Sequence, residues 1–123
     1  MIIDGKKYKY RMINQDFHCA LDVTMHFIGG KWKVIVIWYL RNGKKRFGEL
    51  KSCIPDITDK MLSIQLKALE EDGLISRKVY AEVPPRVEYE LTEEGTSLLP
   101  IVESIAKWGR TKAEKVGRLI ADD

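Results

Sequence analysis

The sequence predicts an α+β fold, mostly α, in which a helix-turn-helix is followed by a β-ribbon. Leucines at helical spacing predict a helix over 58–72, and two alternating segments joined by a proline-containing loop predict the ribbon over 75–91. A chain of 123 residues is long enough for one domain with a real core. We therefore expect a single domain over 1–123.

The helix over 58–72 has two distinct faces. Leu62, Leu66 and Leu69 recur at i, i+4 and i+7, Thr58 suits the N-cap, and Gly73 suits the left-handed position after the helix. Lysines on the opposite face could lie against phosphates, with small side chains at base edges, although lysines also occur on ordinary solvated helices. The candidate DNA-binding residues here are Thr58, Lys60, Met61, Ser63, Ile64 and Lys67.

The ribbon over 75–91 adds further positive charge. Its two halves alternate apolar and polar residues as half-buried strands do, and Pro84-Pro85 stiffens the loop between them. The hairpin therefore projects, and its candidate DNA-binding cations are Arg77, Lys78 and Arg86.

The segment before the helix-turn-helix gives conflicting signals. Val34 to Leu40 is β-branched and aromatic, which favours a buried strand. Its length with flanks and the stop signal at Gly43 favour a central helix, which is our prediction. After it we expect a basic edge strand over 44–47 and a short helix from Gly48 to Cys53, ended by Pro55.

The chain closes with a predicted helix over 92–120. Thr92 suits its N-cap, and Pro100 predicts a slight kink. Its apolar stripe is broader than one small domain needs to cover, which predicts a partner for this helix. The candidate dimerisation residues are Leu98, Ile101, Val102, Ile105 and Trp108.

Three segments around the ribbon carry a resemblance to a known family. They read DGLI from Asp72, EVPPRVEY from Glu82 and LTEEG from Leu91. With these segments the chain resembles the HxlR family of bacterial winged helix-turn-helix transcriptional regulators. The resemblance implies that 58–72 is a recognition helix in the major groove and that 75–91 is the wing. It also implies extra N- and C-terminal helices for dimerisation.

The N-terminal part matches that family incompletely. Residues 1–17 form a basic segment compatible with a short strand or a solvated arm, and a helix is expected from Leu21 to Ile28. The run IGGKW from Ile28 is intact, but Ala20 follows Cys19 where the family commonly has Pro. Several family members sense oxidants through a Cys at this place. Cys19 is therefore a candidate redox residue, with a buried, inert thiol as the alternative.

Charge and composition narrow the classes of function. The net charge is only +3, but residues 31–51 hold seven basic side chains against one acid, a field that would attract a polyanion. No motif for catalysis, a metal or a cofactor is present, and no apolar run is long enough to cross a membrane. We expect a cytoplasmic protein that is not an enzyme.

Two hypotheses remain. The first is a homodimeric regulator that binds double-stranded DNA at an inverted-repeat operator, with an unknown small-molecule or oxidant effector. The second is a winged-helix module that binds another protein and no DNA. Aromatic or apolar anchors on the outer face of the 58–72 helix would favour the second, and the lysines there favour the first.

Overall fold

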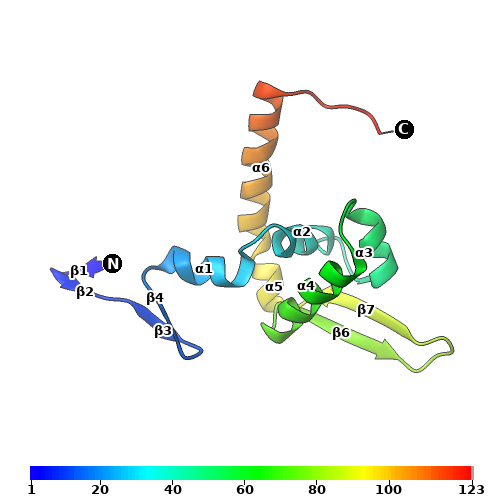
Figure 1. The fold of residues 1–123 in the computed structure, drawn as a ribbon, viewed down its shortest axis with the longest axis horizontal. Coiled ribbons are helices and arrows are strands. Elements are labelled where there is room, and N and C mark those ends of the chain that lie inside the picture. Colours follow the sequence, from blue (N-terminus) through cyan, green and yellow to red (C-terminus); the bar gives the residue numbers. More distant parts are fainter. Residues whose placement is uncertain (123) are drawn as a thin grey trace.

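A computed structural model describes residues 1–122, so the last residue of the predicted single domain lies outside the described part (Figure 1). The fold is α+β, as predicted, and about half of the described residues are in helices. The helices are α1 (Ala20–Ile28), α2 (Trp32–Tyr39), α3 (Phe47–Cys53), α4 (Asp59–Glu71), α5 (Glu93–Ser97) and α6 (Leu99–Val116). The strands are β1 (Ile2–Ile3), β2 (Lys6–Lys7), β3 (Tyr10–Met12), β4 (Gln15–Phe17), β5 (Lys45–Arg46), β6 (Ile75–Tyr80) and β7 (Arg86–Leu91).

The core is built around α2, the segment whose sequence favoured both strand and helix. It is a helix, as predicted, and it packs against α3, α4 and α6. Val36 and Ile37 are fully buried, which explains the apolar character of this segment on nearly all sides. The leucine stripe of α4 completes this core, since Leu62, Leu66 and Leu69 are at most 2% exposed.

The helix-turn-helix consists of α3, a turn and α4. Pro55 follows α3, and the Thr58 hydroxyl accepts a hydrogen bond from the Met61 amide at 3.0 Å, which satisfies a free donor of the first turn of α4. At the other end Gly73 has a φ of 75°, and the Leu74 amide donates to the Leu69 carbonyl at 2.9 Å. Both predicted ends of this helix are confirmed.

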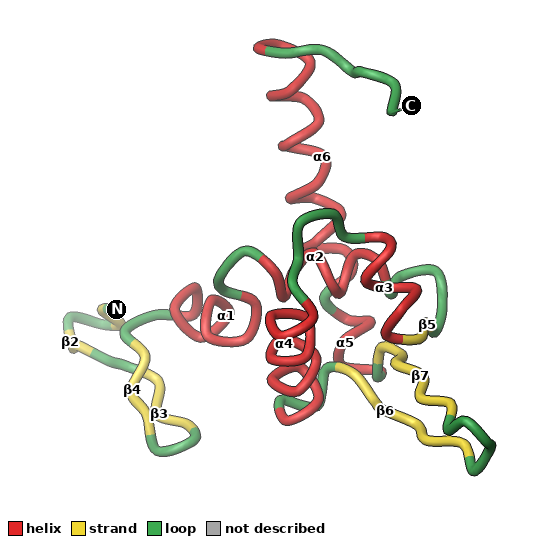
Figure 2. Tube along the Cα trace, turned by 45° about the vertical axis from the view of Figure 1, so that its right-hand side comes forward, coloured by secondary structure: helices red, strands yellow, loops and turns green. Residues whose placement is uncertain are grey.

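The ribbon is a three-stranded antiparallel sheet in the order β5-β7-β6. The predicted edge strand pairs Lys45 with Tyr89. In the hairpin, Tyr80 pairs with Arg86 across the loop, and Ile75 pairs with Leu91 at the base. The hairpin extends away from the helical body in both views (Figures 1 and 2).

The N-terminal segment is more ordered than a solvated arm. It forms two antiparallel hairpins, β1-β2 and β3-β4. Their turns, Asp4-Gly5 and Ile13-Asn14, have positive φ at both central residues, the geometry of tight hairpin turns. The sequence reasoning missed the Asp-Gly signal for the first turn. Both hairpins lie to one side of the body, opposite the wing (Figures 1 and 2).

The segment predicted as one C-terminal helix over 92–120 is two helices. Thr92 caps α5 as predicted, but α5 ends at Ser97 and a new helix begins at Leu99. Pro100 lies in the first turn of α6, where its missing amide N–H costs no hydrogen bond, so it marks a helix start and not a kink. The second helix ends at Val116 and projects from the body (Figure 1). None of the helices described is long and apolar enough to cross a bilayer.

Candidate nucleic-acid interface

The outer face of α4 is exposed along its whole length. Lys60, Ser63 and Lys67 are solvent-exposed, and the Ile64 side chain is 49% exposed. Within residues 1–122 neither lysine forms an ion pair, whereas Lys51 of α3 lies 3.7 Å from the Asp59 carboxylate. The face therefore offers two unpaired cations that flank a small hydroxyl and one aliphatic side chain.

Two of the candidate DNA-binding residues, Thr58 and Met61, stabilise the start of α4 and do not belong to its outer face. The Thr58 hydroxyl is already used as the N-cap acceptor. Met61 is half-buried and packs against the core cluster, and its Sδ lies 3.1 Å from the Gln65 amide nitrogen. These contacts fix the first turn of the helix on which Lys60 is carried.

The three candidate cations of the wing lie on two different faces. Side chains alternate along a strand, so Arg77 shares a face with the buried Ile75. Lys78 lies on the other face, together with Arg86, the cross-strand neighbour of Tyr80. Lys78 and Arg77 are exposed, but Arg86 is half-buried.

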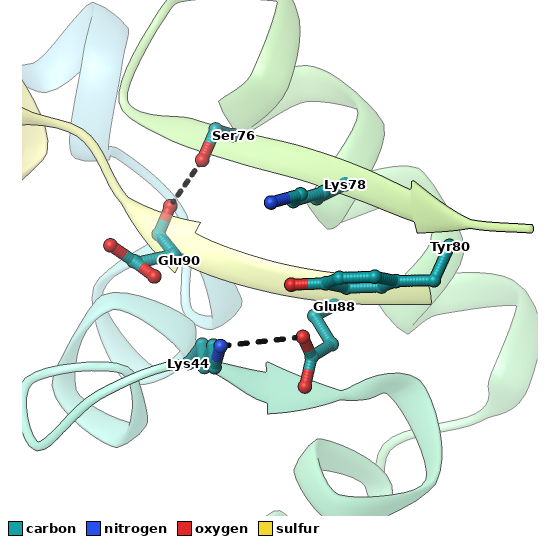
Figure 3. Close-up of a pocket in the computed structure, with 6 residues that line it drawn as sticks. All are labelled: Lys44, Ser76, Lys78, Tyr80, Glu88 and Glu90. Carbon is teal, nitrogen blue, oxygen red and sulfur yellow. Dashed lines mark hydrogen bonds and ion pairs between the residues drawn. The ribbon is translucent and has the colours of Figure 1, made fainter. Parts of the chain in front are cut away.

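The face that carries Lys78 and Arg86 also holds a polar network, which we call the outer wing network. It consists of Lys44, Ser76, Lys78, Tyr80, Arg86, Glu88 and Glu90. Six of them line a shallow hollow of about 280 Å³ (Figure 3). Lys44 Nζ lies 3.6 Å from Glu88 Oε1, and the Ser76 hydroxyl donates to the Glu90 carbonyl at 3.5 Å (Figure 3).

Tyr80 is the centre of this network. The Arg86 guanidinium carbon lies 3.9 Å from the centroid of its ring, and Lys78 Nζ lies 4.9 Å from the same centroid. Hydrogen bonding by the Tyr80 hydroxyl is the largest cause that lowers the pKa of Glu88, followed by the charges of Lys44 and Arg86, against an opposing effect of burial. The carboxylate is therefore held in its charged form.

The sequence reasoning missed Tyr80, Lys44 and Glu88. Alternation alone predicts which residues share a face of one strand, but the register decides which residues meet across strands. A five-residue loop over 81–85 would have placed Tyr80 opposite Arg86 and Lys78 opposite Glu88. An aromatic–arginine pair and an opposite-charge pair at those positions were the available signals.

Only part of the predicted dimerisation stripe is exposed to solvent. Val102 is 2% exposed and belongs to the core of its own chain, so it cannot face a partner helix. Leu98 is half-buried against the same core. Ile101, Ile105 and Trp108 are 45%, 50% and 70% exposed, which leaves three apolar side chains on the outward part of α6.

Cys19 stands at the N-cap position of α1, one residue before the helix begins at Ala20, and is partly exposed. Two basic residues near Cys19 in the sequence, Arg11 and His18, each lie beside an acid. Arg11 Nε donates to the Asp16 carboxylate at 2.7 Å, which helps to hold the pKa of Asp16 well below its usual range, and His18 Nε2 lies 3.8 Å from Asp22. The start of α1 remains as the favourable feature for a thiolate.

No cluster of three or more His, Cys, Asp or Glu side chains that could hold a metal occurs in residues 1–122. The structure is a small helical body with an exposed helix, whose outer face carries two lysines, and a projecting ribbon beside it. This arrangement is the one expected of a protein that places a helix in a groove of a nucleic acid.

Comparison with known proteins decides the family. The model of the HxlR-like helix-turn-helix family matches residues 27–116. The chain belongs to this family. The match begins after the two N-terminal hairpins and includes α2 to α6, so the hairpins lie outside the shared domain.

The relatives are regulators. The chain is 52% identical over 99 residues to the HTH-type transcriptional regulator YkvN of Bacillus subtilis, which covers 80% of this chain and 84% of YkvN. It is 48% identical to the regulatory protein MalR of Fusobacterium mortiferum, over 89% of this chain and 98% of MalR. The oxidised form of the redox regulator HypR superposes with a TM-score of 0.74 at 45% identity, covering 83% of this chain and all of HypR. This HxlR-like chain is therefore a transcriptional regulator of the helix-turn-helix type.

Proposed function

We propose that this HxlR-like protein binds double-stranded DNA sequence-specifically as a homodimer, with α4 in the major groove and the β6-β7 wing beside it. The observation that carries the proposal is the exposed outer face of α4. Lys60 and Lys67, which form no ion pair within residues 1–122, are suited to phosphates, and Ser63 and Ile64 lie between them at positions suited to base edges.

The same face argues against a module that binds only proteins. Energetically dominant residues of protein interfaces are enriched in Trp, Tyr and Arg, and they occupy apolar, desolvated centres. The outer face of α4 carries one exposed aliphatic side chain, Ile64, between two lysines. Desolvating those lysines against a protein would cost free energy, whereas phosphates compensate their charge.

The proposed dimer uses the outward part of α6. Ile101, Ile105 and Trp108 form an apolar stripe on a helix that projects beyond the body (Figure 1). Two copies related by a two-fold axis would bury these side chains against each other and present two α4 helices. The DNA site of such a dimer is an inverted repeat whose half-site centres lie about 10 bp, or a multiple, apart.

A redox or electrophile response through Cys19 is the second part of the proposal. The similar regulator HypR is known in an oxidised and a reduced form, and the similar YodB after treatment with diamide. In this chain Cys19 is partly exposed at the start of α1, while Cys53 packs against the core cluster. Oxidation of Cys19 would change DNA affinity, and Cys53 would stay reduced.

Selection of bound sites from a random duplex pool tests the proposal. The selection is run with reduced protein and with diamide-treated protein in parallel. We expect an inverted repeat from the reduced protein, and a change in enrichment after oxidation that Cys19→Ser abolishes. Absence of any enriched sequence at low salt would rule out sequence-specific binding. It would favour the hypothesis of a module that binds another protein.

A further inference from the structure

We propose that Arg77 is the arginine of the wing that contacts the DNA backbone, and that Arg86 is a positioning residue that stiffens the wing without touching DNA. The inference rests on the proposed function and assigns different roles to residues that the sequence treats alike. It also removes one residue from the candidate interface.

The geometry of the ribbon places the two arginines on opposite faces. Paired residues of an antiparallel hairpin share a face, and successive residues point to opposite faces. Arg77 pairs with Tyr89 and shares its face with Ile75, which is buried in the core where β6 packs against α4. Arg86 pairs with Tyr80 on the opposite face. Only Arg77 therefore lies on the side of the ribbon that adjoins the proposed recognition helix.

Arg86 is already engaged by two neighbouring side chains. Its guanidinium stacks on Tyr80 at 3.9 Å, and one terminal nitrogen lies 3.3 Å from the Glu82 carboxylate. Its side chain is 29% exposed, and its Nε is buried without a hydrogen-bond partner among the described residues. A phosphate could reach this charge only if the stack and the ion pair were given up, so Arg86 is poorly placed to release counterions.

Arg77 has different surroundings from Arg86. Arg77 is exposed, and in the described part of the chain it makes no ion pair and no cation–π contact. Lys78 is exposed too, but it sits beside the Tyr80 ring and directly across from Glu88, in the outer wing network. Arg77 is thus the wing cation that can approach a phosphate without first losing another partner.

The role of Arg86 follows from what it connects. It belongs to β7, it stacks on the last residue of β6, and it pairs with Glu82 inside the loop. These contacts tie the loop over 81–85 to the strands on both sides. A loop already ordered in the free protein loses less conformational entropy on binding. Arg86 therefore raises affinity through the rigidity of the wing.

Salt dependence of DNA binding separates the two roles, because the slope of log K against log salt counts the phosphates that are neutralised. Arg77→Gln should lower this slope by about one. Arg86→Gln should weaken binding roughly three- to tenfold at an unchanged slope, since only ordering is lost. Arg110→Gln on α6 serves as the control and should change neither quantity.

Three further measurements address positioning itself. Backbone ¹⁵N relaxation should show faster motion at 81–85 in Arg86→Gln than in the wild type or Arg77→Gln. Tyr80→Leu should reproduce the affinity loss, and the double variant should be no weaker than either single one, since both remove one stack. Arg86→Lys keeps the charge but lacks the planar guanidinium, so its affinity should remain reduced.

A fall in slope for Arg86→Gln, or an unchanged slope for Arg77→Gln, would overturn the assignment. If the losses of DNA affinity in Tyr80→Leu and Arg86→Gln were additive, Arg86 would not act through its stack on Tyr80, and the positioning role would be wrong. Failure of the underlying function has a different signature: the wild type would show no salt-dependent binding, or Lys60→Gln on α4 would leave its slope unchanged.

Discussion

Glu88 shows how single side chains fix the wing. The Tyr80 hydroxyl, Lys44 and Arg86 all favour its charged form and lower its pKa below the ordinary 4.5. Because the folded pKa is lower than the unfolded one, this network stabilises the wing at pH values above about 4.5. The contribution is lost as the pH falls through the folded pKa.

Removal of the Tyr80 hydroxyl tests this network. In Tyr80→Phe the pKa of Glu88 should rise toward its ordinary value, because the largest of the three favourable contributions is gone. Carboxyl ¹³C chemical shifts followed over pH measure the change directly. Tyr89→Phe is the matched control, because Tyr89 lies on the other face of the ribbon. An equal rise of the Glu88 pKa in Tyr89→Phe would contradict the role given to the Tyr80 hydroxyl.

The redox proposal also belongs to a single residue. After mild diamide treatment, Cys19 should be modified and Cys53 should not, because Cys53 packs on the core cluster. Mass spectrometry and non-reducing gels of the wild type, Cys19→Ser and Cys53→Ser read this out. If Cys19 stayed unmodified and the DNA affinity were unchanged after oxidation, Cys19 would be a structural thiol with no redox role.

Among the secondary-structure elements, the short helix α5 joins the wing to the helix-turn-helix by close contact. The Thr92 hydroxyl donates to the Gly73 carbonyl at 2.6 Å and accepts from the Gly95 amide at 3.1 Å, and the Thr92 amide donates to the Leu74 carbonyl at 3.1 Å. Gly95 lies so close to the end of α4 that a Cβ would clash with the Leu74 carbonyl oxygen. This contact explains the glycine of the LTEEG segment.

Two glycine substitutions test that packing. Gly95→Ala should lower the free energy of unfolding by about 1–3 kcal/mol, since α5 must move away from Leu74. Gly109→Ala, in the middle of α6 with open space around it, should raise it by up to about 1 kcal/mol through helix propensity. Urea denaturation of both variants gives the comparison. A loss at Gly95 no larger than the change at Gly109 would refute the proposed clash.

The elements that the sequence predicted well are those with a strong local signal. Periodic leucines and caps at Thr58 and Gly73 defined α4, and alternation defined β6 and β7. Features that depend on distant residues were not predictable in this way. Val102 carries the same pattern as Ile105, but only the packing of α6 on α2 buries one and exposes the other. Arg86 resembles Arg77 until the hairpin register places Tyr80 beside it.

For the whole molecule, the proposed dimer depends on the exposed stripe of α6. Trp108→Glu should yield a monomer at micromolar concentration, because a charge would be buried at the interface, and it should leave the fold of each chain intact since Trp108 is 70% exposed. Analytical ultracentrifugation and affinity for a full inverted repeat measure the effect. Lys107→Glu, on the other side of α6, is the control. A wild type that is monomeric and bound to a single half-site would contradict the dimer.

Binding of DNA by the outer face of α4 is measured by the salt dependence of the affinity for the selected site. Titrations of the wild type should give log K falling linearly with log salt, and the double variant Lys60→Gln with Lys67→Gln should lower the slope by about two. Lys107→Gln on α6 should leave it unchanged. A double variant with the slope of the wild type would show that the outer face of α4 does not neutralise phosphates.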